Sequence, residues 1–348
     1  MVARRRLGVR ARRFWRRHRT LFWTLHSLWA LATGVLVVWL ARERYSFVPW
    51  VVLFLLLTWA STLYFGRRMG GGTEPGGGSA PTSPGLAEEA TSYLTRTMYQ
   101  ETLFFLLPFY AYSTVPGSPN MAFLLGLGVL AVLSCLDLVF DRILRTSPVA
   151  SMAFFSIVAF AALNLLLPIL LPLEPTTATR IAAVGAVLSA VPLVRGGITW
   201  SPSTTVRVAA AGCLFVGVAV AMPTVIPPVP LRLESGVFAA GIHRETLTPV
   251  DTLESEALST ELDGTIVALM EVFAPTAVPT SVTLRWKRDG EVIRESREIE
   301  ILAHELGFRV WDAWRPETGD VRPGRYEVEL STSSGRIFGR VAVVVEDG

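Results

Sequence analysis

Long apolar runs constrain the fold of this chain more than any other feature. Seven runs of spanning length fill residues 21–228, and a segment of about 120 residues with strand-like alternation follows them. A helix needs about 20 consecutive apolar residues to cross the hydrocarbon core of a bilayer. Only 18% of the residues are charged, below the roughly 25% of a soluble globular chain. Apolar runs followed by a segment of alternating residues predict an all-α membrane domain followed by an all-β antiparallel sandwich domain.

We expect three parts: a basic cytoplasmic arm (1–20), a polytopic membrane domain (21–228) and a C-terminal β-sandwich (229–348). A cytoplasmic loop rich in glycine and proline (69–85) is predicted to be a flexible linker, because its composition cannot form a packed core. About seven transmembrane helices are predicted, at 21–41, 47–66, 96–116, 121–140, 149–172, 180–198 and 206–228.

The sixth predicted span has the least support. Its apolar stretch contains only 14 residues before Arg195, and short apolar runs are also typical of interfacial or re-entrant segments. If this segment does not cross, the C-terminal domain moves to the cytoplasmic side. We expect a crossing, because Arg195 and Arg207 would otherwise lie outside the cytoplasm.

The distribution of arginine predicts the orientation. Nine arginines lie in the first 19 residues; with a cytoplasmic N-terminus, 16 arginines fall on inner segments and three on outer loops. Basic residues concentrate in the cytoplasmic loops of membrane proteins. An odd number of crossings then places residues 229–348 in the periplasm, with the chain in the inner (cytoplasmic) membrane of a bacterium.

The charge balance changes sign along the chain. Residues 1–230 contain 19 basic and 8 acidic residues, whereas residues 231–348 contain 13 basic and 21 acidic residues. The positive charge of residues 1–230 follows from the placement of arginines on the cytoplasmic side of the membrane. It therefore does not indicate nucleic-acid binding, and the predicted partners are membrane lipids and not nucleic acid. The acidic half disfavours docking of the C-terminal domain on anionic lipid or nucleic acid.

Ionisable residues inside predicted spans are candidates for a functional site. Glu101 and Asp137 lie at similar distances from the short loop at 116–120, so antiparallel helices would place both carboxylates at one depth, where they would not both stay charged. One hypothesis is a proton- or cation-linked site, and the other is an interfacial ion network that fixes helix register. The intramembrane candidates are Arg96, Gln100, Glu101, Asp137, Asp141, Arg142 and Asn164, of which Asn164 is expected to bond between helices.

A proline-rich connector, MPTVIPPVP (222–230), joins the two halves of the chain. Repeated prolines fix φ and favour an extended backbone. We therefore expect a semi-rigid stalk that holds the sandwich at a set distance from the membrane.

After Pro230 the hydrophobic period changes to two. Val282, Leu284 and Trp286 alternate with polar residues in SVTLRWKR (281–288), and Asp289-Gly290 follows, a strong signal for a hairpin turn. Short strands separated by turns predict an antiparallel sandwich. Further strands are predicted at 265–273, 291–301, 324–330 and 336–346, with a second turn at Ser334-Gly335.

Aromatic side chains in this part allow two interpretations. Trp286, Trp311, Trp314 and Tyr326 could form a platform for a sugar or a peptide. They could equally fill the core of a small sandwich, which is the more common role. The chain contains no HExxH, GxSxG or P-loop pattern, so we predict no catalytic residue, no metal site and no cofactor.

Four segments of the C-terminal part follow one another in an order typical of one family. They are GVFAAGIHRETLTPVD (236–251), VTLRWKRDGEVIRE (282–295), GFRVWDAW (307–314) and PGRYEVELSTSSGRI (323–337). They resemble a bacterial Ig-like domain of unknown function, in which Tyr326 stands where tryptophan is usual. YQETLFFLLPFYAYS (99–113) is similar to a polytopic inner-membrane domain of unknown function often fused to it. The resemblance implies an Ig-like sandwich and a role for Arg244 and Glu245, such as a structural ion pair.

Two functions follow as hypotheses. The favoured one is a non-enzymatic anchor that presents a periplasmic Ig-like module for binding a protein or glycan partner. The alternative is a transporter or lipid-handling membrane protein that uses Glu101 and Asp137 within the membrane.

Overall fold

The computed structural model of the chain describes the later helices and most of the C-terminal part. The described residues are 25, 28, 29, 32, 36, 86–135, 148–171, 173–195, 201–253, 256–259, 262, 264–274, 280–301, 308–317 and 319–347. The chain divides into two compact units. The first comprises Met1–Pro108 and Gly128–Ser147, and the second comprises Phe109–Leu127 and Pro148–Gly348.

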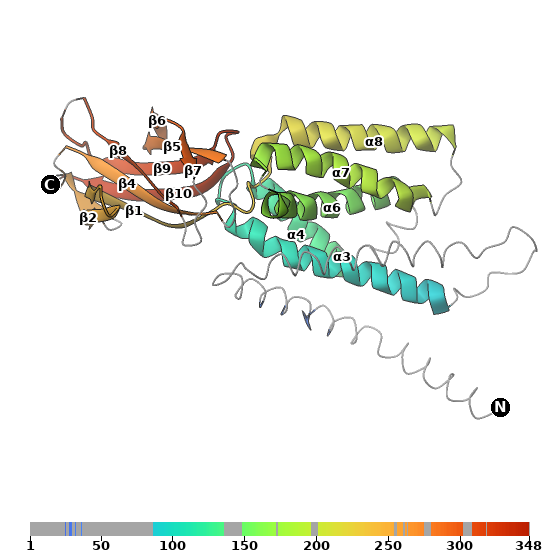
Figure 1. The fold of residues 1–348 in the computed structure, drawn as a ribbon. Helices are drawn as coiled ribbons and strands as arrows, with labels where there is room; N and C mark the ends of the chain where they lie inside the picture. Colours follow the sequence, from blue (N-terminus) through green and yellow to red (C-terminus); the bar gives the residue numbers. More distant parts are fainter. Residues whose placement is uncertain are drawn as a thin grey trace, which may run out of the picture. The chain divides into compact units, whose positions relative to one another are not determined.

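Within the described residues there are five α-helices, labelled in Figure 1, and one short 3-10 helix. Their bounds are α3 (Leu86–Tyr112), α4 (Met121–Cys135), α6 (Pro148–Leu170), α7 (Pro175–Arg195), α8 (Pro202–Ala221) and η2 (Pro223–Val225). In the second unit, α6 packs against α7 and α8, and α7 packs against α8.

Two stretches of these helices, Met152–Leu170 and Pro202–Ala221, are long and apolar enough to cross a membrane by length and composition. The described part of the chain thus has five helices with two such stretches, and not the seven predicted spans. The predicted spans at 21–41 and 47–66 and the linker at 69–85 lie outside the described residues, apart from the isolated positions between 25 and 36.

The last predicted span was placed too far along the chain. We predicted 206–228, whereas α8 begins at Pro202 and ends at Ala221. Ser201 caps the helix with its side-chain oxygen, which accepts a hydrogen bond from the backbone N–H of Thr204 at 3.2 Å. The helix ends at Ala221 because Pro223, one residue beyond the cap, has no N–H to continue the hydrogen-bond ladder.

The proline-rich connector is not the extended stalk that we predicted. It begins with the 3-10 turn η2, and residues 226–231 are all buried. Fixed φ angles are compatible with both a stalk and a packed segment. Ile226, Val229 and Leu231 are apolar, so burial of their side chains favours the packed form.

The C-terminal part consists of two β-sheets (Figure 1). The first sheet has the order β2 (Thr248–Leu253), β1 (Arg232–His243), β4 (Ile266–Phe273), β8 (Phe308–Trp314). The second has the order β3 (Glu256–Leu258), β10 (Ile337–Glu346), β9 (Gly324–Thr332), β5 (Thr280–Arg288), β6 (Glu291–Glu295), with β7 (Ile299–Ile301) also paired to β5. The pairs are antiparallel except that β3 runs parallel to β10.

The predicted strands are largely confirmed, with one exception. Asp289 and Gly290 both have positive φ (52° and 88°) in the turn between β5 and β6, as a two-residue hairpin requires. The predicted strand at 291–301 is instead two strands. Ser296 interrupts it, because its Oγ accepts the backbone N–H of Leu284 at 2.9 Å in place of a strand carbonyl.

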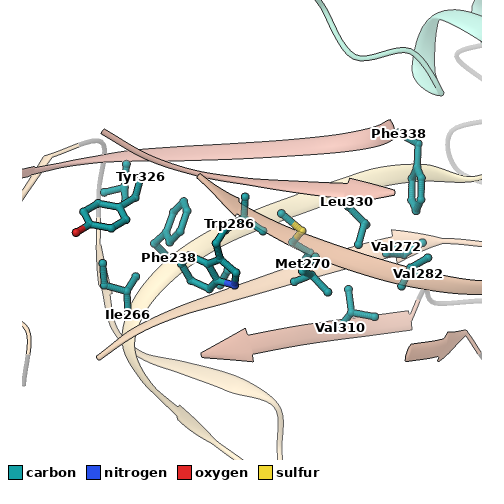
Figure 2. Packing of buried hydrophobic residues seen from close by; sticks show 14 of the residues in the cluster. Phe238, Ile266, Met270, Val272, Val282, Trp286, Val310, Tyr326, Leu330 and Phe338 are labelled. Atoms are coloured by element: carbon teal, nitrogen blue, oxygen red, sulfur yellow. The ribbon is translucent and has the colours of Figure 1, made fainter. Parts of the chain in front are cut away.

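Side chains of both sheets share one hydrophobic core (Figure 2). The alternation in β5 buries Val282, Leu284 and Trp286, as predicted. The ring of Phe238 on β1 meets Trp286 edge-on at 5.9 Å between centroids, so the two sheets are in contact through aromatic packing.

Gly236 on β1 lies at a close approach between the two sheets. A Cβ atom at this position would lie 2.3 Å from Cγ1 of Val341 on β10. We expect Gly236→Ala to lower the free energy of unfolding of the full chain in detergent by about 1–3 kcal/mol, because a packed core must shift to admit the methyl group.

Gly241 provides the matched control on the same strand. A Cβ there would meet Cβ of Val250 at 3.7 Å, an ordinary van der Waals contact. Gly241→Ala should change stability by less than about 0.5 kcal/mol. Equal effects of the two substitutions in denaturant titrations would contradict this account of the sheet packing.

Candidate functional site

Asn164 lies at the centre of a chain of buried polar side chains in the second unit. Its Nδ2 donates to the hydroxyl of Tyr110 on α3 at 3.1 Å. Its Oδ1 lies 2.8 Å from the hydroxyl of Thr179 on α7, which donates to it. The structure therefore shows the bonds between helices that we expected for Asn164, since they connect α3, α6 and α7.

Arg336 extends this chain into the C-terminal part. It lies between β9 and β10, is 1% exposed, and donates from Nη1 to the hydroxyl of Thr179 at 2.9 Å. At the other end of the chain, the Tyr110 hydroxyl donates to the backbone carbonyl of Ala161 at 2.9 Å. We call Tyr110, Asn164, Thr179 and Arg336 the polar chain.

Burial has a direct electrostatic consequence for Arg336. Loss of hydration lowers the pKa of its guanidinium to about 10, against the attraction of Tyr110 and Glu174. At neutral pH the group remains protonated. The polar chain thus contains one buried positive charge.

Two further hydrogen bonds connect the β9–β10 region to the loop between α3 and α4. Asn120 is buried, and its Nδ2 donates to the carbonyl oxygen of Ile337 at 2.6 Å. Arg340 donates from Nη1 to the carbonyl oxygen of Pro116 at 3.1 Å. Positive φ at Gly117 (76°) lets this loop turn sharply between the two contacts.

A buried carboxylate holds Arg340 in place. Glu329 on β9 is 2% exposed; its carboxylate accepts from Nη2 of Arg340 at 2.7 Å and pairs with Nζ of Lys287 at 2.7 Å. Burial raises the pKa of Glu329, but the hydrogen bonds and charges of Lys287 and Arg340 outweigh it, so the pKa lies below its usual 4.5. Glu329 is therefore ionised at neutral pH.

Aromatic rings in the same unit connect four helices in a row. Tyr110 on α3 lies 5.2 Å from Phe123 on α4, which lies 5.9 Å from Phe160 on α6. Phe160 in turn lies 5.6 Å from Phe215 on α8. Phe123 thus places an apolar ring against the Tyr110 end of the polar chain, and apolar surroundings raise the free-energy cost of leaving a polar group without a hydrogen bond.

The predicted carboxylate pair is only partly described. Gln100 on α3 is buried and donates from Nε2 to the sulfur of Cys135 at 3.1 Å, and Glu101 is half-buried on the same helix. Asp137, Asp141 and Arg142 lie outside the described residues, as does the side chain of Arg96. The hypothesis of two carboxylates at one depth stays a prediction.

The four aromatic residues proposed as a platform are not on one exposed surface. Trp286 and Tyr326 are fully buried in the shared core, because the same alternation that forms the strands turns them inward. Trp286 donates from Nε1 to Asp312 at 2.9 Å, and the Tyr326 hydroxyl donates to the carbonyl oxygen of Arg322 at 2.8 Å. The half-buried Trp314 ring packs on Tyr326 at 5.5 Å.

Trp311 is the member of this set that lies beside Arg244. The guanidinium of Arg244 stands 6.0 Å from the centroid of the Trp311 ring. Among the described residues, Arg244 and Glu245 form no ion pair with each other, so this implied role is not seen. A hollow of about 310 Å³ is lined by His243 at the end of β1 and by Arg244, Glu245 and Thr246 in the turn after it.

Sequence reasoning missed most of the polar chain. Tyr110, Thr179 and Arg336 carry no motif, and they are separated by up to 226 positions. Only Asn164 stood out, as a polar side chain in an apolar run. In the part of the chain that the structure describes, no group of three His, Cys, Asp or Glu side chains is placed to hold a metal ion.

The described residues thus define a class of protein with a helical part followed by a C-terminal region of two β-sheets. Within the second unit, the buried polar chain connects the β region to the ends of three helices. The chain belongs to DUF5924, a family of unknown function whose sequence model matches residues 4–263. No match is found among curated proteins.

The matched range contains all five helices and continues through β3, ending before β4. Tyr110, Asn164 and Thr179 lie inside it, and Arg336 lies beyond it. We had expected a family resemblance on each side of residue 229. The match confirms membership of a family of unknown function, and its single range continues across that position.

Glu329 allows a test of the contact between Arg340 and the α3–α4 loop. We expect Glu329→Gln to destabilise the full chain by about 2 kcal/mol at pH 7, because it leaves Lys287 and Arg340 without their buried counter-charge. The native pKa lies below 4.5, so this stabilisation is present above about pH 4.5 and disappears as the pH falls through the native pKa. Denaturant titrations of both proteins from pH 7 to pH 3 measure the difference.

The control is Glu295→Gln. Glu295 pairs with Arg285 at 3.1 Å, but both side chains are exposed, so the loss should stay below about 1 kcal/mol at every pH. A Glu329→Gln effect that does not shrink on acidification would contradict the role assigned to the carboxylate.

Proposed function

We propose that this protein is a multi-pass protein of a bacterial inner membrane whose helices anchor the C-terminal β region on the periplasmic side. In this role it is a non-enzymatic anchor that presents an Ig-like interaction module. The supporting observation is the outward-facing apolar surface of the helices.

Three helices carry apolar side chains on their exposed faces. Leu188 on α7 is 64% exposed, Leu214 on α8 is 68% exposed and Val129 on α4 is 58% exposed. They belong to faces that continue along each helix: Leu125, Val129 and Val132 on α4; Ile181, Val184 and Leu188 on α7; and Val206, Leu214 and Val218 on α8. In water each such side chain costs about 1.5–3 kcal/mol relative to burial, whereas lipid removes that cost.

The sixth crossing also has support in the helix lengths. α7 contains 21 residues, which is about 31 Å at 1.5 Å per residue and matches the thickness of the hydrocarbon core. Its apolar part, Pro175–Val191, is shorter than the two stretches that are long and apolar enough to cross, so the support comes from the length of the whole helix. It packs along α6, with Leu163 of α6 beside Gly185 of α7. Together with a cytoplasmic N-terminus and the predicted spans at 21–41 and 47–66, a full crossing by α7 would make the number of crossings odd and put the β region outside the cytoplasm.

The Ig-like assignment draws support from two residues. Trp286 is buried on a central strand of the second sheet, and Tyr326 near the start of β9 donates its hydroxyl to a carbonyl four residues upstream. A buried tryptophan and such a tyrosine corner are typical of immunoglobulin-like sandwiches. The hollow lined by His243–Thr246, with Arg244 next to Trp311, is the candidate binding surface of this module.

Cys213 reports directly on the apolar surface, because it is exposed on α8. We expect it to resist a membrane-impermeant maleimide in permeabilised membranes and to react once detergent replaces the lipid. Labelling without detergent would show that α8 faces water and would contradict the membrane assignment.

Orientation is tested with single cysteines in a chain lacking Cys135 and Cys213. Glu291→Cys on the exposed strand β6 should react with the impermeant reagent in intact spheroplasts, because the β region is proposed to face the periplasm. Ala3→Cys in the basic arm should react only after permeabilisation. Protection of Glu291→Cys in intact spheroplasts would reverse the proposed topology.

The binding surface is tested in cells with a photo-crosslinking residue. Placed at the exposed Thr246, it should give a discrete adduct that is lost on Trp311→Ala or Arg244→Ala, whereas placed at the exposed Val292 on β6 it should give none. Mass spectrometry of the adduct separates a protein partner from a glycan. Equal adducts at both positions would contradict a specific surface at the hollow.

A further inference from the structure

We propose that Arg336 and the N-terminal end of α7 form a binding site for a phosphate group. Arg336 is 1% exposed, and its Nε has no hydrogen-bond partner among the described residues. Within the part of the chain that the structure describes, its guanidinium makes one hydrogen bond, from Nη1 to the neutral hydroxyl of Thr179. A buried positive charge with a donor that makes no hydrogen bond is costly, and a bound anion would lower that cost.

The start of α7 supplies a second attraction for an anion. The first turn of this 21-residue helix contains no acidic residue. Pro175 has no N–H, and the N–H of Ala178 donates to the carbonyl oxygen of Glu174 at 2.9 Å. Thr176 and Thr177 therefore supply the remaining backbone donors beside the positive end of the helix dipole. Thr179, the residue that Arg336 contacts, is the fifth residue of the helix. The guanidinium of Arg336 therefore lies, through Nη1, beside the start of α7.

The charges around the site leave room for a negative ligand. Glu174 precedes α7, and its carboxylate accepts a hydrogen bond from the hydroxyl of Thr176. It attracts Arg336 from beyond ion-pair distance, and Arg180 on α7 repels Arg336. Among the described residues, no carboxylate forms an ion pair with Arg336. Glu174 would nevertheless compete with a bound anion for the positive charge of Arg336, so a test must distinguish the two.

Phosphate fits this donor set better than a single-point anion. A guanidinium edge binds two oxygens of a tetrahedral anion at once, and a helix N-terminus binds another through backbone N–H groups. The phosphate could come from a lipid headgroup or from free phosphate in solution. The site itself does not depend on the membrane assignment, because free phosphate would bind in either case.

The test is thermal unfolding of the full chain, delipidated in a phosphate-free maltoside detergent. One series adds inorganic phosphate; the other adds phosphatidylglycerol, with diacylglycerol as the phosphate-free comparison. We expect the wild-type Tm to rise by about 3 °C or more with a bound phosphate group. A response to inorganic phosphate identifies a free-anion site, and a response only to phosphatidylglycerol identifies a lipid headgroup.

Three variants separate the site from general effects. Arg336→Gln should abolish the Tm rise, whereas Arg325→Gln, an exposed arginine on β9, should retain it. Glu174→Gln should bind phosphate several-fold more tightly, because the competing carboxylate is gone. If Arg336→Gln does not fold, the wild type and Glu174→Gln decide the question.

The proposal is overturned if neither phosphate source raises the wild-type Tm above the diacylglycerol comparison. It is also overturned if Arg336→Gln responds as the wild type does. If Glu174 were instead the intended counter-ion, Glu174→Gln would destabilise the chain and phosphate would not restore it.

Discussion

The buried guanidinium of Arg336 constrains more of the second unit than any other single group. Its hydrogen bond to Thr179 requires the start of α7 at one position, and the hydroxyl of Thr179 requires Asn164 of α6. Asn164 in turn requires Tyr110 of α3. Each group left without its bond costs about 1–3 kcal/mol, more where charge is involved. The ends of three helices and the turn between β9 and β10 are therefore coupled, and none can shift alone.

The connector between the helices and the sheets is also held in place by buried contacts. A proline-rich exposed stalk would let the β region move independently of α8. Here residues 226–231 are buried, and Asn120 and Arg340 add contacts to the loop after α3. Because prolines restrict the backbone in either state, the apolar side chains between them decide the outcome. A charged residue at position 226 or 229 would favour the stalk that we first expected.

Local patterns predicted the β region well where they depend on neighbours along the chain. The alternation of Val282, Leu284 and Trp286 predicted the buried face of β5, and Asp289-Gly290 predicted its turn. The break at Ser296 was missed because it depends on a hydrogen bond to Leu284 twelve positions away. The sequence left the platform and the core open for Trp286, and the structure places it in the core with Val282 and Leu284.

Predicting the polar chain required knowledge of the packing. Asn164 was identifiable because a lone amide in an apolar helix needs a partner, but its partners Tyr110 and Thr179 lie 54 and 15 positions away. Arg336 was predicted only as the first residue of the strand at 336–346. The long-range pairing of a charge from one element with hydroxyls of others leaves no periodicity in the sequence, so the site emerges only when the elements are assembled.

The position of the polar chain along the helices fits the proposed membrane location. Tyr110 is two residues from the end of α3, Thr179 is four residues from the start of α7, and Asn164 is six residues from the end of α6. At 1.5 Å per residue the deepest group lies about 9 Å from a helix end. An arginine at the middle of a bilayer costs about 2.5–3.5 kcal/mol even on insertion scales. Here the arginine enters from a turn between strands and meets the helices near their ends, so a bilayer around them would not need to hold a charge at its centre.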